Sequence, residues 1–210
     1  MKTILCYGDS NTYGYNPENF LRYGKDRRWT GILSNLLGSG YEVLEEGCNS
    51  RTTAFDDPTE DWVNGMTYLK TCLKSHMPID IFVLMLGSND LKNCFNVSAR
   101  EIAEKIREMV RLAKDFSLMS QGYAPTVILV SPPLIGEDIH KSPFYPDFDE
   151  SAVTRSRLLA AEYKSVAKAE NCLFYDAGPV AEISFLDQVH LSEKGHHDLG
   201  QGLFEFIKNI

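Results

Sequence analysis

Long apolar runs are missing from this 210-residue chain. No stretch approaches the roughly 20 apolar residues that cross a bilayer, which argues against a membrane-spanning helix. The first apolar segment ends at Gly8. This is too early for the roughly 7–15-residue core of a secretory signal, so we expect a cytoplasmic protein. An excess of basic residues is also missing: the formal net charge of -8 argues against nucleic acid and anionic membranes as partners.

Paired cysteines and metal-binding patterns are absent as well. The five cysteines are scattered and odd in number, without any Cys-x-x-Cys, which is typical of reduced thiols in a cytosolic protein. The chain lacks the His-Glu-x-x-His, Cys/His and Gly-rich phosphate-binding patterns, so we expect neither a metal ion nor a cofactor. It also lacks Gly-x-Ser-x-Gly, which excludes the nucleophile elbow of the α/β-hydrolases.

What the chain does contain is a regular alternation of strand-like and helix-like segments. Short apolar runs predict strands over 3–7, 42–45, 79–86, 126–130 and 172–175. Periodic apolar residues predict helices over 28–37, 59–76, 98–116, 150–169 and 192–207. This order predicts a single α/β domain over residues 1–210, with a parallel sheet between two layers of helices.

One stretch interrupts the alternation. Residues 131–149 carry prolines at 132, 133, 143 and 146 and show no periodic pattern. Loops of this length in compact domains are often lids or binding loops. A plain surface connection between two elements is the alternative.

Polar residues follow several of the predicted strands. Gly8-Asp9-Ser10 follows the first strand, Gly47–Thr53 the second and Gly87–Asp90 the third, while Asp187 and His190 come after the fifth. In an open parallel sheet, ligands bind beyond the carboxyl ends of the strands, so these groups should converge at one edge. Together they form the set that acyl transfer requires, namely a nucleophile, an oxyanion donor, a base and an acid.

Each of these residue types has a chemical reason to be there. The hydroxyl of Ser10 can attack a carbonyl only when a base takes its proton, and His190 can do so because the pKa of histidine lies near neutrality. The carboxylate of Asp187, three residues earlier, can fix the tautomer of the ring. Each spacing alone is weak evidence, because a serine after a strand is more often a helix cap.

The same residues, in the same order, carry a family resemblance across nearly the whole chain. Gly8-Asp9-Ser10 resembles the first block of the SGNH hydrolases, also called GDSL-type esterases, and Gly47–Thr53 resembles the second. Gly87–Asp90 matches the GxND block, and Asp187 with His190 matches DxxH. The resemblance implies a serine esterase with a flavodoxin-like three-layer α/β/α sandwich and a five-stranded parallel sheet. Within the family, the chain is most similar to the arylesterase and acyltransferase branch, whose members form oligomers.

By that resemblance, Ser10 is the nucleophile, His190 the general base and acid, and Asp187 the residue that orients the imidazole. The oxyanion hole would comprise the backbone N–H groups of Ser10 and Ser50 and the side-chain amide of Asn89. The family usually has glycine where this chain has Ser50, but a backbone donor does not require glycine. Candidates for the wall of an acyl or aryl pocket are Tyr13, Tyr15, Phe55 and Phe144.

The resemblance leaves the substrate open. A small-molecule ester is the expected partner, and hydrolysis differs from acyl transfer only in whether water or an alcohol attacks the acyl-enzyme. Carbohydrate O-deacetylation and thioester or lysophospholipid cleavage on the same triad are alternatives. A non-catalytic ligand-binding module is an alternative of another class, because a fold does not fix a function. Assembly into a homo-oligomer also stays open.

Overall fold

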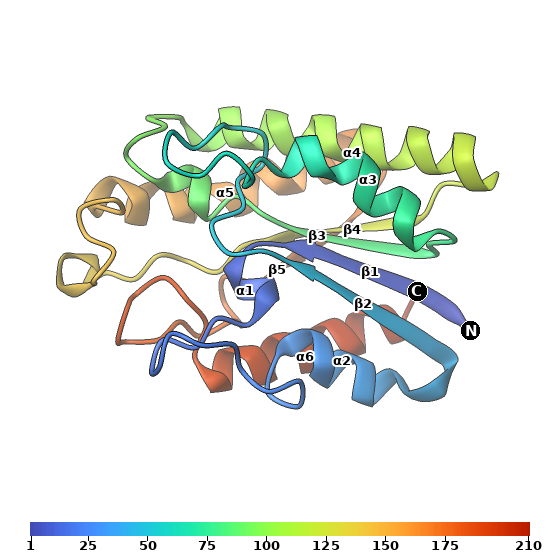
Figure 1. Ribbon diagram of the computed structural model, residues 1–210, viewed down its shortest axis with the longest axis horizontal. Helices are drawn as coiled ribbons and strands as arrows, with labels where there is room; N and C mark the ends of the chain where they lie inside the picture. Colours follow the sequence, from blue (N-terminus) through green and yellow to red (C-terminus); the bar gives the residue numbers. More distant parts are fainter.

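A parallel sheet of five strands forms the middle layer of the protein. The computed structural model describes all residues from 1 to 210, and its strands pair in the order β2-β1-β3-β4-β5, all in parallel (Figure 1). This is the strand order of the flavodoxin-like sandwich, so the predicted fold class is confirmed. The strands are β1 (Lys2–Gly8), β2 (Tyr41–Gly47), β3 (Ile81–Met85), β4 (Thr126–Ser131) and β5 (Leu173–Asp176).

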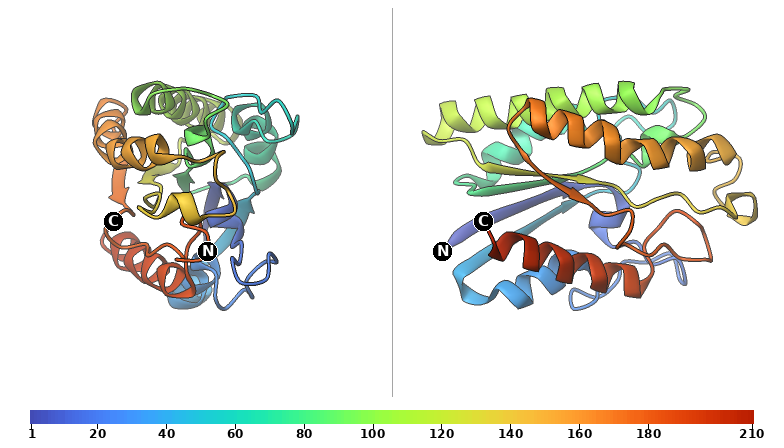
Figure 2. Two further views of the ribbon diagram at one scale, coloured as in Figure 1. Left: turned by 90° about the vertical axis from the view of Figure 1, so that its left-hand side faces the viewer. Right: turned by 180° about the vertical axis from the view of Figure 1, so that it is seen from behind.

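Helices cover both faces of this sheet. Three helices pack on one face and two on the other, as the views in Figures 1 and 2 agree. The first group is α3 (Gly65–His76), α4 (Ala99–Gln121) and α5 (Glu150–Ala169), and the second is α2 (Trp29–Leu37) and α6 (Glu193–Lys208). The shorter elements are α1 (Ser10–Tyr13) and the 3₁₀ turns η1 (Gly38–Gly40), η2 (Asn89–Leu91) and η3 (Ile139–Lys141).

The central strands supply apolar side chains to two separate cores. Successive side chains of a strand point to opposite faces, so a fully apolar strand can be covered on both sides. In β3, Leu84 belongs to the core under α4, whereas its neighbour Val83 belongs to the core above α2 and α6. Both side chains are fully buried. The near-continuous apolar runs of the sequence are thus explained by burial on both faces.

Two helix boundaries differ from the prediction by more than one residue. The helix expected over 59–76 begins only at Gly65, because the side chain of Asn64 caps it by accepting a hydrogen bond from Thr67 N at 3.2 Å. Residues 59–64 belong to the preceding loop instead. The helix expected to end at 116 continues to Gln121 and stops at Gly122, where φ is 88°. Its predicted capping box, Ser98 with Glu101, is present.

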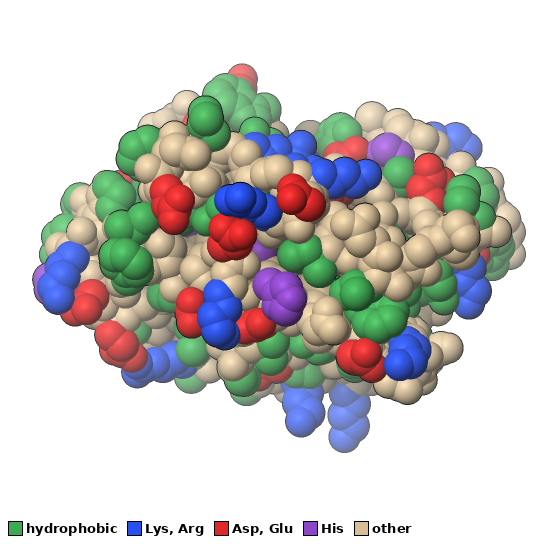
Figure 3. Space-filling model, turned by 90° about the horizontal axis from the view of Figure 1, so that it is seen from below, with side chains coloured by type: hydrophobic (Ala, Val, Ile, Leu, Met, Phe, Trp, Pro, Cys, Tyr) green, Lys and Arg blue, Asp and Glu red, His purple; other side chains and the backbone are tan.

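The loops that follow the carboxyl ends of the strands lie together at one edge of the molecule. In Figure 1 these loops lie on the left, opposite the two chain termini. The face seen in Figure 3 carries acidic and basic side chains intermixed. None of the helices combines the length and the apolar character that crossing a membrane requires.

Gly87, which follows β3, is a position where the fold requires glycine. Its φ is 117°, and a Cβ atom there would lie 2.3 Å from the hydroxyl of Tyr163. That buried hydroxyl donates a hydrogen bond of 2.8 Å to the carbonyl of Leu86, so it cannot easily move away.

We therefore predict that Gly87→Ala lowers the free energy of unfolding by about 2–4 kcal/mol, because it combines backbone strain with a steric clash. Urea denaturation measures this value. Gly40→Ala is the control: a Cβ at Gly40 has no atom within 4 Å, so its unfolding curve should match that of the wild type. Equal unfolding midpoints for Gly87→Ala and the wild type would contradict the prediction.

Candidate active site

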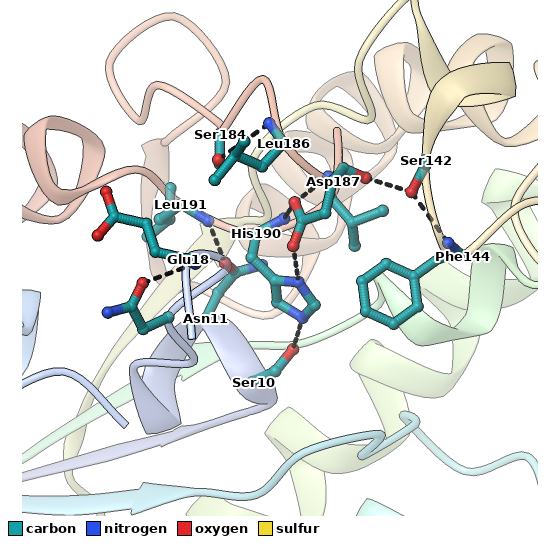
Figure 4. Close-up of polar contacts among 12 residues, drawn as sticks. Ser10, Asn11, Glu18, Ser142, Phe144, Ser184, Leu186, Asp187, His190 and Leu191 are labelled. Carbon is teal, nitrogen blue, oxygen red and sulfur yellow. Dashed lines mark hydrogen bonds and ion pairs between the residues drawn. The ribbon is translucent and has the colours of Figure 1, made fainter. Parts of the chain in front are cut away.

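A serine, a histidine and an aspartate are joined by two hydrogen bonds at the carboxyl edge of the sheet (Figure 4). Ser10 Oγ lies 2.9 Å from His190 Nε2, and His190 Nδ1 lies 2.7 Å from Asp187 Oδ2. The imidazole can therefore contact both the hydroxyl and the carboxylate at the same time. All three residues are largely buried, with relative exposures of 7% or less.

The end of β1 positions Ser10. The strand closes at Gly8, where a Cβ atom would lie 2.1 Å from Thr12 Oγ1, so the first turn of α1 can approach the strand only because residue 8 is glycine. Asp9 caps α1 by accepting a hydrogen bond of 2.9 Å from Asn11 N. Ser10 is the first residue of this helix, and the first N–H groups of a helix have no acceptor within it. The backbone N–H of Ser10 is thus placed as a donor beside its own hydroxyl.

A tight turn positions Asp187 and His190. The backbone N–H groups of Val189 and His190 both donate to Asp187 Oδ1 at 3.0 Å, which leaves Oδ2 for the imidazole. The turn holds Gln188 at a φ of 62°, a left-handed conformation that is uncommon outside glycine. The spacing of three residues therefore lets one carboxylate bind both the backbone and the ring of the same histidine.

The long loop after β4 forms one wall of the site. Ser142 donates a hydrogen bond of 2.5 Å to the carbonyl of Asp187 and accepts one of 3.1 Å from Phe144 N. The ring of Phe144 lies edge-on to His190 with 5.3 Å between ring centroids, and Tyr15 lies 4.2 Å from the same ring. The two aromatic rings shield the imidazole from water.

A cavity of about 410 Å³ opens beside these residues. Ser10, His190, Asn89 and Ser50 line it together. Its apolar lining comes from Tyr15, Phe144, Phe148 and Val189, and its polar lining includes Thr59, Glu60, Lys92 and Asp147. The volume suits a small ligand rather than a macromolecule.

Two loops bring the candidate oxyanion donors to this cavity. Ser50 has a φ of 62°, a left-handed conformation that glycine adopts more readily than serine. The Asn89 amide donates to the carbonyl of Arg51 at 3.1 Å, and its second N–H remains for a ligand. Asp90 accepts hydrogen bonds of 3.0 and 3.1 Å from Thr53 N, which ties the two loops together.

Of the four aromatic residues expected to form the pocket wall, two line the cavity and two lie elsewhere. Tyr15 and Phe144 line the cavity. Tyr13 instead lines a neighbouring hollow, and its ring lies 4.5 Å from the Arg22 guanidinium carbon. Phe55 does not line the cavity but packs against Phe95, with 6.0 Å between ring centroids, and against the adjoining core. The expectations for Tyr13 and Phe55 were both wrong, because the Tyr13 ring stacks on Arg22 and the Phe55 ring packs against the apolar core.

Sequence reasoning missed several contributors to the site, three of which form contacts that hold it together. Asn11 and Ser142 form hydrogen bonds to the segment that carries Asp187 and His190. Lys92 lines the cavity and forms an ion pair of 3.0 Å with the buried Asp57. Asn11 carried one signal, its position next to Ser10, although all three contacts join segments that are far apart in the sequence.

One group of potential metal ligands occurs away from the cavity. Glu46, Cys72 and His76 place their ligand atoms within 4.8 Å of one another. The Glu46 carboxylate already pairs with His76 at 2.6 Å, and the Arg51 guanidinium donates to the carbonyl of Glu46. Burial raises the pKa of the Cys72 thiol, which disfavours the thiolate that a metal would need. The ion pair accounts for this cluster.

The geometry defines the class of site: a serine, a histidine and a carboxylate in hydrogen-bonded series, with donors beside a small cavity, as in serine acylhydrolases. The chain belongs to the GDSL-like Lipase/Acylhydrolase family, whose model matches residues 6–197. The expected family is thereby confirmed.

Solved structures show the same relationship along the full chain. The aryl esterase of M. smegmatis is 36% identical, with a TM-score of 0.93, and the match covers 100% of this chain and 99% of that one. A carbohydrate acetylesterase from Sinorhizobium meliloti is 32% identical, with the same TM-score and the same coverage of both chains. No curated protein sequence matches the chain.

Two buried carboxyl groups near the site, those of Asp9 and Asp90, have raised pKa values. Burial raises the pKa of the Asp9 carboxyl to about 6, although the N–H of Asn11 and the nearby His190 oppose the shift. Burial also raises the pKa of Asp90 to about 6, against the hydrogen bonds from Thr53. Both groups therefore bind protons more tightly in the folded protein than in the unfolded chain.

The raised pKa values predict a pH-dependent stability difference. An Asp whose pKa is raised on folding stabilises the protein in acid, and this contribution is lost as the pH rises from about 4 to 6. Asp9→Asn lacks this ionisation. Between pH 7 and pH 4.5, the free energy of unfolding of the wild type should rise relative to that of Asp9→Asn by on the order of 2 kcal/mol. Urea denaturation at the two pH values tests this, and a constant difference, or a loss in the wild type, would contradict it.

Proposed function

We propose that this protein is a serine esterase that hydrolyses small acyl esters through an acyl-enzyme on Ser10. The observation that carries the proposal is the pair of hydrogen bonds, 2.9 and 2.7 Å long, that connects Ser10 to His190 and His190 to Asp187 at the cavity. Family membership supports it, because the family comprises lipases and acylhydrolases.

The first half of the reaction forms the acyl-enzyme. Ser10 Oγ attacks the ester carbonyl while its proton passes to His190 Nε2, and the Asp187 carboxylate stabilises the resulting imidazolium. The tetrahedral intermediate then collapses, the bond to the alcohol breaks, and His190 donates its proton to the leaving alkoxide. In the second half, water attacks the acyl group while His190 Nε2 takes its proton. The second tetrahedral intermediate then collapses: the bond between Ser10 Oγ and the acyl carbon breaks, His190 returns the proton to Oγ, and the carboxylic acid leaves.

An oxyanion hole would stabilise the tetrahedral intermediates. The proposed donors are the backbone N–H groups of Ser10 and Ser50 and the free N–H of the Asn89 side chain, all three residues lining the cavity. Each donor is fixed before the substrate binds, by the start of a helix, by a left-handed turn and by a hydrogen bond to Arg51. Donors held in advance do not need to reorganise when charge develops on the oxygen.

Ser10→Ala tests the nucleophile. The substitution should lower kcat for a chromogenic short-chain ester by at least about 10⁴-fold, because no other group can form the acyl-enzyme. Its unfolding midpoint should stay close to that of the wild type, since only one hydroxyl is removed. Steady-state kinetics with purified protein gives the answer, and a variant with wild-type turnover would exclude Ser10 as nucleophile.

A pair of substitutions tests the oxyanion donors. Asn89→Ala should lower kcat by roughly 10²–10³-fold with little effect on KM, because an oxyanion donor acts mainly in the transition state. Ser50→Gly should leave kcat nearly unchanged, because it keeps the backbone N–H and suits a φ of 62°. A large loss in Ser50→Gly would assign the role to the serine side chain instead.

The cavity favours carbohydrate O-deacetylation as a second candidate within the esterase class. Its aromatic side can hold a small acyl group, whereas Thr59, Glu60, Lys92 and Asp147 offer hydrogen-bonding groups to the hydroxyls of an alcohol. The structural neighbours include both an aryl esterase and a carbohydrate acetylesterase. Comparing kcat/KM for phenyl acetate and for acetylated sugars, in the wild type and in Asp147→Asn, separates the candidates. A loss in Asp147→Asn confined to the sugar esters would favour the carbohydrate.

A further inference from the structure

Asn11 connects the two distant segments that carry Ser10 and His190. Its side-chain oxygen accepts a hydrogen bond of 2.9 Å from the backbone N–H of Leu191, the residue directly after His190 (Figure 4). Asn11 is itself the residue directly after Ser10. One hydrogen bond thus joins the neighbours of the two groups that exchange a proton.

The Asn11 backbone is fixed on both sides. Its N–H donates to Asp9 Oδ1 at 2.9 Å, and its carbonyl accepts a hydrogen bond of 3.0 Å from the indole N–H of Trp29. The residue is 1% exposed. The side-chain oxygen therefore extends from a rigid backbone. Its hydrogen bond to Leu191 N fixes the distance between α1 and the segment after His190.

The other backbone anchors of His190 come from its own segment. The N–H of His190 donates to Asp187 at 3.0 Å, and its carbonyl accepts a hydrogen bond of 2.7 Å from Ser184 N. These two bonds shape the turn but do not fix its distance from Ser10. Apart from the bond between Ser10 and His190 itself, the bond from Leu191 to Asn11 is the hydrogen bond that joins this turn to α1.

The Asn11 amide nitrogen supports the same interpretation. It is buried and has no hydrogen-bond partner, whereas the oxygen of the same amide accepts the hydrogen bond from Leu191 N. A buried amide with an unpartnered nitrogen is unfavourable for stability. The amide of Asn11 therefore forms only one of the two kinds of hydrogen bond that it could form. The acceptor oxygen is the part of the side chain that contributes to the site.

We propose that Asn11 is a positioning residue that holds His190 at proton-transfer distance from Ser10 through the backbone of Leu191. This inference rests on the proposed function, because the distance matters only if Ser10 and His190 exchange a proton. Small displacements of reacting groups can lower rates by roughly 10²-fold. Loss of the acceptor should therefore reduce kcat and leave the substrate-binding walls in place.

Three variants test the proposal. Asn11→Leu removes the acceptor at similar volume, Asn11→Asp keeps an acceptor oxygen in the same place, and Asn16→Leu is the matched control. Asn16 is 6% exposed and accepts a hydrogen bond of 2.9 Å from Glu18 N, and none of its hydrogen bonds goes to the segment that carries His190. Steady-state kinetics on a chromogenic short-chain ester gives kcat and KM, and urea denaturation gives the stability of each variant.

The expected pattern separates positioning from a general loss of structure. Asn11→Leu should lower kcat by roughly 10- to 100-fold with KM within about threefold of the wild type. Asn11→Asp should recover most of that loss, and Asn16→Leu should lose stability while keeping a kcat near that of the wild type. If Asn11→Leu does not fold, the proposal is tested by Asn11→Asp and Asn11→Ser, and a kcat that is equal in these two variants contradicts it.

Two results would overturn the inference. One is a folded Asn11→Leu variant with wild-type kcat, and the other is an equal fall in kcat for Asn11→Leu and Asn16→Leu. Failure of the proposed function has a different signature, because the wild type itself would then be inactive, or Ser10→Ala would be as active as the wild type.

Discussion

The hydrogen bond between Ser10 and His190 spans 2.9 Å in space and 180 residues in sequence. Because both residues follow strands of the same parallel sheet, their meeting depends on the strand order and on the way each loop leaves its strand. Gly8 lets α1 start close to β1, and the turn from Asp187 to His190 directs the imidazole back across the sheet edge. The sheet and these two turns hold the two side chains at a fixed distance, and proton transfer is sensitive to that distance.

Burial gives the site its chemical character. Tyr15 and Phe144 cover the imidazole, and the nearby carboxyl groups of Asp9 and Asp90 are buried enough for their pKa values to rise to about 6. In such surroundings a hydrogen bond or a fixed dipole has a larger effect than in water. The same burial makes unpaired polar groups unfavourable, which explains why the loops that reach the cavity are held by hydrogen bonds between different segments.

The sequence allowed most of the framework to be predicted, because the strands and helices follow from local apolar patterns. The fold class and the family were also accessible, since the polar blocks at residues 8–10 and 187–190 stand in a recognisable order. Features that depend on tertiary contacts were not predictable. Phe55 turns towards Phe95 instead of the cavity, and Ser142 binds the carbonyl of Asp187 from a loop without any local pattern. The late start of α3 is an intermediate case, because Asn64 could have been recognised as a cap.

The proposed reaction requires that Ser10 is a nucleophile activated by His190. This can be tested by treating the wild-type protein with a serine-directed phosphonate, followed by mass analysis of the intact chain and its peptides. We expect one covalent adduct per chain, located on Ser10, and none in His190→Ala under the same conditions. An adduct on another residue, or no adduct at all, would contradict it.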